Sequence, residues 1–313
     1  MKKFLSMCAT IIAIFLIIYI CIQVYNYIVN LDAEGEKITS INNEPIFTLE
    51  NYPKVDASLA TQPLTDAFME NFTGVLPTEE ELDYTNTHPA YVRLINGEVD
   101  LIVVTEPSKE ELELAKQAGV EFEVIPVVKE GFVFYVNEKN PVKNLSLEQI
   151  QDIYTGEITN WKEVGGNDAE IRAFQRPENS GSQTGMYSLV MKDKKIMEAP
   201  KEDLIETMFE IINLVSDYDN GENSIGYSYY YYATTMYDDM DKDVADRIKL
   251  LGVNGIEPNY ETIKNDIYPL KTAYYIVINK NEPKGSNTRK LVDAMLSERG
   301  QGVAKEAGYV QVN

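Results

Sequence analysis

Short apolar runs alternate with amphipathic segments along the chain beyond about residue 48. Residues 101–104 form a continuous apolar run, which is typical of a strand buried on both faces. Residues 132–137 and 273–278 are rich in the aromatic and β-branched side chains that favour strands. Segments between these runs, such as 64–72, place apolar residues three or four positions apart, as amphipathic helices do. This alternation predicts an α/β fold.

Several helix starts can be placed from pairs of polar residues three positions apart. Ser108 with Glu111, Ser146 with Gln149 and Ser180 with Gln183 each fit a capping box. Thr87 is a further expected N-cap, because a proline follows it in the first turn. Gly97 is expected to end the helix that begins there.

Four junctions between a strand and the following helix carry polar side chains. They fall at residues 52–64, 84–89, 100–108 and 170–184. In open α/β sheets, ligands bind beyond the carboxyl ends of the strands. We therefore expect the four junctions to contribute to one shared site.

The segment 176–184 has the composition of an anion site at a helix N-terminus. Ser180 is expected to cap a helix whose first backbone amides point outward without intrahelical partners. Gly181 permits close approach of a ligand, Ser182 adds a hydroxyl, and Arg176 adds a planar cationic fork suited to oxyanions. The alternative is that Ser180 is only a helix cap and Arg176 only a solvated surface residue.

Charge and composition exclude several classes of function. The formal net charge is −22, which argues against a nucleic-acid partner. Cys8 and Cys21 are the only cysteines and both lie in the N-terminal apolar segment, so no thiolate nucleophile, disulfide or zinc cluster is expected downstream. His88 is the only histidine, and we interpret it as an exposed residue in the first turn of a helix.

The N-terminal residues 1–30 are expected to form a transmembrane anchor. Residues 4–28 are almost entirely apolar, and this length suffices to span a bilayer. Lys2 and Lys3 precede the segment, which favours a cytoplasmic N-terminus and an extracytoplasmic position for everything downstream. A cleaved signal peptide is the alternative and leads to the same compartment. Residues 31–48 are polar and without clear periodicity, so we expect a linker.

The order of short motifs resembles the phosphate-type solute-binding proteins of ABC transporters. The resemblance covers residues 50 to 313 and rests on Asp56-Ala57-Ser58, Gln62-Pro63-Leu64, Gly156-Glu157-Ile158-Thr159-Asn160-Trp161, Arg176 with Ser180-Gly181-Ser182, and Ile225-Gly226-Tyr227. It implies a two-lobed periplasmic-binding-protein fold with a ligand cleft between the lobes. The first lobe would comprise 49–134 with a return segment 271–313, and the second lobe 135–270.

The resemblance also implies the site residues. Arg176 would clamp the anion, Ser180 and Ser182 would donate hydroxyls, and Gly181 would donate its amide. The first lobe would contribute Ser58, Leu59 (with Thr61 as the alternative in that loop), Thr87, Thr105 and Glu106.

Two positions depart from the family pattern. The glycine of the first loop is replaced by Ala57, and the aspartate that follows the third strand is replaced by Thr105-Glu106. If Glu106 reaches the cleft, its carboxylate accepts a hydrogen bond from a protonated oxygen of phosphate and repels sulfate. If Glu106 turns outward, Thr105 lines the pocket, and its hydroxyl discriminates poorly between the two ions.

Together with the expected N-terminal anchor, the resemblance implies an extracytoplasmic, membrane-anchored protein that captures phosphate, or a similar oxyanion, and delivers it to an ABC transporter permease. No cofactor, metal or catalysis is expected. A surface-anchored sensor for another oxyanion or small solute is the alternative. A phosphatase is a weaker one, because it needs an activated nucleophile or a metal cluster.

Overall fold

A computed structural model describes residues 44–76, 78, 83–217, 221–236 and 242–312. Residues Ile46–Asn313 form one compact unit, and the preceding residues belong to a separate one. The expected anchor (1–30) and most of the expected linker (31–43) lie outside the described residues. In the part of the chain that is described, no helix is long and apolar enough to cross a membrane.

The strand β3 (Phe122–Asn137) runs through the middle of the main sheet and takes part in both of its halves. Up to Gly131 it pairs antiparallel with β9 (Lys271–Asn279), and from Phe132 it pairs antiparallel with β6 (Ser224–Tyr229). All residues from Glu130 to Asn137 are buried, whereas the first five residues of the strand are exposed or half-buried. The register of β3 against β9 shifts between Pro126 and Val128, because proline has no N–H to donate to the ladder.

The remaining strands extend the sheet on both sides. The order is β1-β2-β9-β3-β6-β5, with β10 and β7 also pairing with β3. We call β1, β2, β9, β10 and the N-terminal part of β3 the first sheet half, and β5, β6, β7 and the C-terminal part of β3 the second sheet half. A separate two-stranded sheet joins β4 to β8. The strands not yet bounded are β1 (Val55–Ala57), β2 (Leu101–Val104), β4 (Asn144–Leu145), β5 (Arg172–Ala173), β7 (Ile248–Leu250), β8 (Gly252–Val253) and β10 (Val310–Gln311).

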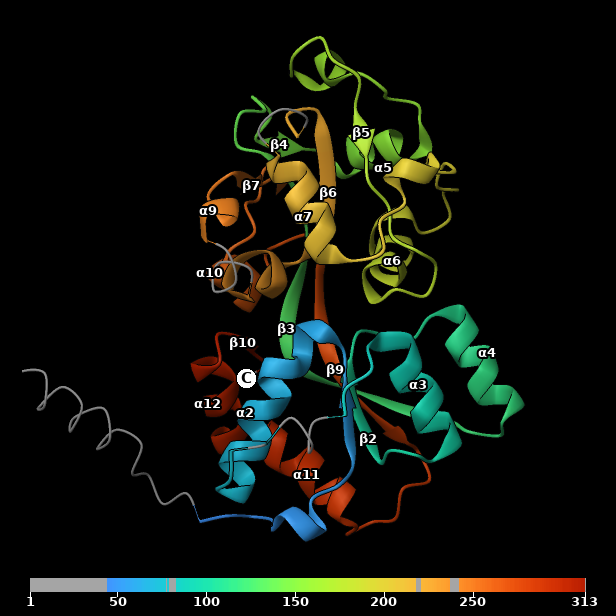
Figure 1. The fold of residues 1–313 in the computed structure, drawn as a ribbon, viewed down its shortest axis with the longest axis vertical. Helices are drawn as coiled ribbons and strands as arrows, with labels where there is room; N and C mark the ends of the chain where they lie inside the picture. The colour runs from blue at the N-terminus through green and yellow to red at the C-terminus, as the bar shows by residue number, and fades with distance from the viewer. Residues whose placement is uncertain (1–43, 77, 79–82, 218–220, 237–241, 313) are drawn as a thin grey trace, which may run out of the picture. The chain divides into compact units, whose positions relative to one another are not determined.

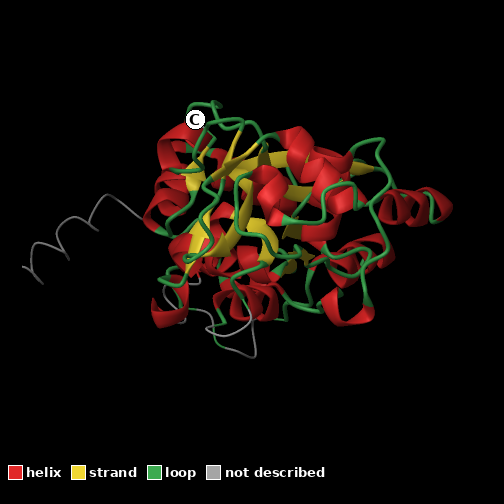
Figure 2. Cartoon of the chain, turned by 90° about the horizontal axis from the view of Figure 1, so that it is seen from above, coloured by secondary structure: helices red, strands yellow, loops and turns green. Residues whose placement is uncertain are grey.

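The helices surround the strands (Figure 2) and fall into two groups. Figure 1 shows one group beside the first sheet half and the other beside the second. The first group is α2 (Gln62–Thr73), α3 (Thr87–Asn96), α4 (Lys109–Gln117), α11 (Asn287–Leu296) and α12 (Glu298–Glu306). The second group is α5 (Leu147–Thr155), α6 (Gly181–Gly185), α7 (Met208–Ser216), α9 (Lys242–Ala245) and α10 (Tyr260–Lys264). Short 3-10 turns are η1 (Leu49–Asn51), η2 (Leu59–Thr61), η3 (Trp161–Val164) and η5 (Lys201–Asp203), and π-helical segments are η4 (Met186–Met191) and η6 (Tyr232–Met236).

The predicted helix starts are largely confirmed. Ser108 and Ser146 form complete capping boxes, and Gly97 ends α3 with a left-handed φ of 71°. The prediction for Thr87 was wrong by one residue. Asn86 is the N-cap, because its side-chain oxygen accepts a hydrogen bond from the Thr87 amide at 2.9 Å.

Aromatic side chains fill the core where β3 meets β6. Phe132 contacts Tyr227 and Tyr229, with ring centroids 5.5 and 5.6 Å apart, and Phe134 contacts Tyr154 at 5.9 Å. All of these residues are at most 2% exposed. These aromatic contacts therefore fix the end of β6, where Tyr229 lies.

Candidate functional site

A pocket of about 410 Å³ lies where the two sheet halves approach each other. It is lined from the first sheet half by the start of η2, the start of α3 and Thr105. It is lined from the second by the segment 176–182, the start of α7 and Tyr229. Eight of the ten expected site residues line it: Ser58, Leu59, Thr87, Thr105, Arg176, Ser180, Gly181 and Ser182. The junctions singled out in the sequence therefore meet at one place.

Arg176 supplies the buried positive charge of this pocket. Its side chain is 8% exposed, and Nη2 donates to the carbonyl oxygen of Glu206 at 2.6 Å. Its backbone amide donates to the Tyr227 hydroxyl oxygen at 2.9 Å, which holds the residue at the end of its segment. Burial lowers the pKa of the guanidinium, although arginine stays charged in proteins. Nε is buried and has no hydrogen-bond partner among the described residues.

The start of α6 faces the first sheet half across the pocket. Ser180 caps the helix by accepting from the Gln183 amide at 3.2 Å. The reciprocal half of the expected capping box is absent, because the Gln183 side chain accepts from the Arg176 amide and the Tyr227 hydroxyl instead. Ser182 Oγ is buried and unpaired within the described part of the chain. The cap is therefore confirmed, and an unpaired hydroxyl lies in the first turn of α6.

Gly181 lies against the side chains that come from the opposite half. A Cβ at this position would lie 2.6 Å from Thr105 Oγ1 and 2.9 Å from Thr87 Oγ1. These distances are shorter than real contacts, so only glycine fits here with the neighbours as they are. The carbonyl oxygen of Gly181 accepts from the Tyr229 hydroxyl at 2.9 Å. Two threonine hydroxyls therefore lie within reach of the first amides of α6.

Thr105, and not Glu106, lines the pocket. Thr105 Oγ1 is buried without a hydrogen-bond partner among the described residues, and the Thr105 carbonyl oxygen accepts from Tyr91 at 2.8 Å. Glu106 lies in a neighbouring pocket of about 610 Å³, where it accepts a hydrogen bond from the Ser188 hydroxyl. Successive side chains of an extended segment point to opposite sides, so Thr105 inward places Glu106 outward. The expectation that Glu106 faces the pocket is thus corrected.

Thr61 also lies outside the pocket. It is completely buried, and its hydroxyl donates to the Val103 carbonyl oxygen at 2.5 Å. Its Oγ1 is 2.9 Å from the hydroxyl oxygen of Ser58. Thr61 therefore orients Ser58, which does line the pocket, and joins the η2 turn to β2.

Four charged or ionisable residues line the pocket without having been expected there, one of which is Tyr229. Glu178 and Glu206 carry carboxylates, and His88 lies near the start of α3. The sequence interpretation of His88 as a simple exposed residue needs correction, since its side chain is only 33% exposed and contacts Glu111. The sequence did contain a signal for His88, because it is the only histidine and directly follows the expected site residue Thr87. Nothing in the sequence marks Glu206, because only the fold brings the start of α7 to this place.

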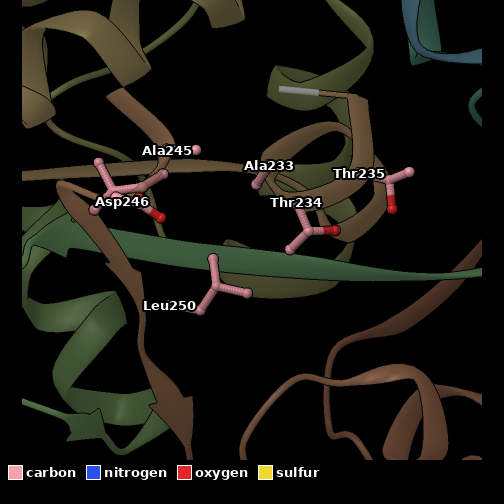
Figure 3. Close-up of a pocket in the computed structure, with 7 residues that line it drawn as sticks. Ala233, Thr234, Thr235, Ala245, Asp246 and Leu250 are labelled. Carbon is pink, nitrogen blue, oxygen red and sulfur yellow. The ribbon is translucent and has the colours of Figure 1, made fainter. Parts of the chain in front are cut away.

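Another pocket, of about 470 Å³, offers little to an anion. Figure 3 shows its lining, which has no cationic side chain among the described residues and carries one carboxylate, Asp246. No group of three or more histidine, cysteine, aspartate or glutamate side chains in the described ranges is arranged to hold a metal ion. The pocket around Arg176 is therefore the better candidate for a ligand site.

The fold and this pocket agree with a comparison against protein families. Residues 55–299 match the family model described as a PBP superfamily domain. The chain belongs to the PBP superfamily. The expected α/β periplasmic-binding-protein fold is thereby confirmed.

Several relatives are about a quarter identical to this chain over the residues that align. The phosphate-binding protein PstS of Bacillus subtilis is 26% identical over 260 residues, covering 82% of this chain and 80% of PstS. PstS of Staphylococcus haemolyticus is 25% identical over 270 residues, covering 84% and 81%. A phosphate ABC transporter substrate-binding protein from Clostridium perfringens, solved with bound phosphate, has a TM-score of 0.61 and 25% identity. That match covers 84% of this chain and all of the other.

Proposed function

We propose that this protein is an extracytoplasmic solute-binding protein that captures inorganic phosphate for an ABC transporter. The observation that carries the proposal is a set of buried, unpaired donors facing one pocket. Arg176 Nε, Ser182 Oγ and Thr105 Oγ1 lack hydrogen-bond partners within the described residues. Buried polar groups are normally paired, and the oxygens of a bound anion would pair these. Relatives of this chain that span most of its length are named as phosphate-binding proteins.

A tetrahedral anion would have donors from both sheet halves. From the second half we assign the Arg176 guanidinium, the Gly181 amide and the hydroxyls of Ser180 and Ser182. From the first half we assign Ser58 and Leu59, Thr87 and Thr105. Donors fixed before the ligand arrives need no reorganisation, and charge-assisted hydrogen bonds of this kind are the strong ones.

Capture would occur by closure of two lobes without breaking any bond. We assign residues 49–134 and 271–313 to one lobe and 135–270 to the other. The strand β3 passes from the first sheet half into the second, so it connects the lobes directly. The closed lobes would then present the ion to a permease.

An N-terminal anchor would keep the binding domain near its permease. The apolar segment within residues 1–30, preceded by Lys2 and Lys3, supports a single membrane span with the rest outside. Of the expected linker 31–48, only the residues up to 45 would serve as the tether, because the compact unit begins at Ile46 and Phe47 is buried in it. Finding the mature N-terminus beyond residue 30 by N-terminal sequencing of the native protein would contradict the anchor and leave the compartment unchanged.

Calorimetric titration with phosphate, arsenate, sulfate and a panel of sugars tests the proposal. We expect one phosphate per chain, no sugar binding and no turnover. Thr105 can donate to any of the three oxyanions, so position 105 by itself does not exclude sulfate. Binding of a sugar without binding of phosphate would refute the proposed ligand. Release of phosphate from a phosphate ester would instead support an enzyme.

A further inference from the structure

His88 lies at the edge of the anion pocket and is held there by a buried carboxylate. Its Nδ1 is 3.0 Å from Glu111 Oε1, and the Glu111 side chain is 1% exposed. The other oxygen of Glu111 accepts from the Ser108 amide at 2.7 Å as part of the α4 capping box. The carboxylate is therefore fixed by its own helix, and it fixes the imidazole in turn.

The contact with Glu111 determines which nitrogen of His88 remains available. An ionised carboxylate only accepts hydrogen bonds, so when Glu111 is ionised the Nδ1 atom carries a proton toward it. In the described part of the chain Nε2 makes no hydrogen bond, and His88 lines the pocket. A histidine held in this way presents an unprotonated Nε2 when neutral and a second N–H donor when protonated.

The charges around the pocket leave a role for a second cation. Apart from His88, the charged side chains of the lining are Arg176, Glu178 and Glu206, whose formal charges sum to −1. Tyr229 is the remaining titratable group of the lining, and Glu111 faces the imidazole from α4. The N-terminus of α3 disfavours a positive charge in its first turn, and the Glu111 carboxylate opposes that effect. A protonated His88 brings the lining to neutrality before an anion enters.

We propose that His88 is a titratable ligand of the bound anion, donating from Nε2 when the imidazole is protonated. This inference rests on the proposed function, because it requires an anion in this pocket. Proton uptake and anion binding then strengthen each other reciprocally. Phosphate affinity is therefore expected to be higher at a pH at which the imidazole is protonated than at one at which it is neutral.

Two substitutions separate this role from a structural one. His88→Asn keeps a δ-position N–H that reaches Glu111 but removes the ε nitrogen. His88→Gln retains an amide donor at the ε position that cannot become charged. Calorimetric titration with inorganic phosphate at pH 5.5 and 8.5 compares each variant with the parent at the same pH, so that the titration of free phosphate cancels.

We expect His88→Asn to weaken phosphate binding about tenfold at pH 5.5 and by less than about twofold at pH 8.5. His88→Gln should lie between the parent and His88→Asn at pH 5.5. Equal affinities of His88→Asn and parent at both pH values would show that His88 only supports the helix, and would overturn the inference. So would a loss of the same size at both pH values.

The imidazole can also be observed directly, because the chain has no other histidine. In protein prepared without a histidine tag, the ring signals in a carbon–proton correlation spectrum belong to His88 alone. Saturating phosphate should move the midpoint of their pH titration upward; an unmoved midpoint would overturn the inference. Absence of phosphate binding in the parent would overturn the proposed function as well, which distinguishes the two failures.

Discussion

Glu130 is a buried carboxyl at the point where β3 passes from one sheet half to the other. Its side chain is 2% exposed, and its oxygens accept from the backbone amides of Gly131 at 2.8 Å and Tyr231 at 3.3 Å. These partners are neutral and do not compensate for the loss of water around a carboxylate. Burial therefore raises the pKa of Glu130 from 4.5 to about 8, and the backbone hydrogen bonds offset only part of this.

The raised pKa makes stability depend on pH with a defined sign. Between pH 4.5 and 8 the folded chain keeps a proton on Glu130 that the unfolded chain has released. Stability therefore falls as pH rises through this window, with no penalty below pH 4.5 and the full penalty above pH 8. A difference between 4.5 and about 8 corresponds to a penalty on the order of 5 kcal/mol. Glu130→Gln mimics the protonated form of the side chain and therefore removes this penalty.

Urea unfolding followed by the fluorescence of the single tryptophan, Trp161, measures this effect. Trp161 is 1% exposed in the folded chain, so unfolding transfers it to water. We expect Glu130→Gln to match the parent near pH 5 and to be more stable by several kcal/mol at pH 9.

Glu123→Gln is the matched control on the same strand. Glu123 is partly exposed and pairs with Arg289 at 2.6 Å. Its loss should cost about 1 kcal/mol or less, without a trend between pH 5 and 9. If the stability difference between Glu130→Gln and the parent is the same at both pH values, the reasoning about burial is refuted.

Three further predictions concern the pocket. Arg176→Ala should weaken phosphate binding by about 2–5 kcal/mol in calorimetry, and Arg176→Lys should recover only part because the planar fork is lost; unchanged affinity would contradict the site. Gly181→Ala should weaken binding more than about tenfold, because the added Cβ collides with Thr105 Oγ1. Gly302→Ala, whose Cβ meets nothing, is its control and should bind normally. Glu106→Gln should leave the phosphate affinity, and the ability of sulfate to compete with phosphate, within about twofold of the parent. A larger change in the competition by sulfate would show that Glu106 does face the pocket.

Helix starts were predictable because a cap depends on residues close together in the sequence. The Ser108 and Ser146 boxes each need only a partner three residues later. The same locality explains why Ser180 was recognised as a cap. The second half of that box was not predictable in the same way. Its absence depends on a distant contact, because the Gln183 side chain accepts a hydrogen bond from Tyr227, 44 residues away in the sequence.

The length of β3 was not predictable from its own residues. The expected strand began at Phe132, whereas β3 begins at Phe122. Residues 123–130 include Pro126 and several charged side chains, which are unusual in a strand interior. They form a strand because β9, some 150 residues later, supplies the pairing partner. The burial of Glu130 is a consequence of that pairing and has no signal in the local sequence.

The choice between Thr105 and Glu106 depended on a property that the sequence does not contain. Both residues follow the apolar run 101–104, and alternation allows only one of them to face the pocket. The structure pairs Glu106 with Ser188 and leaves Thr105 opposite Gly181. Resemblance to a family indicates which position in the chain corresponds to a site residue. The direction of a side chain after the end of a strand, however, depends on the turn that follows.

An anion site in a chain of net charge −22 has to rely on short-range contacts. Exposed charges more than roughly 8–10 Å apart are largely screened at physiological salt, so most surface carboxylates contribute little at the pocket. What remains is local: a buried guanidinium whose hydrogen bond goes to a neutral carbonyl oxygen, unpaired hydroxyls and helix amides. Because Glu178 and Glu206 lie in the same lining as Arg176, the charged side chains around the pocket sum to −1 without His88. The protonation state of one imidazole is therefore a large part of the charge that an incoming anion meets.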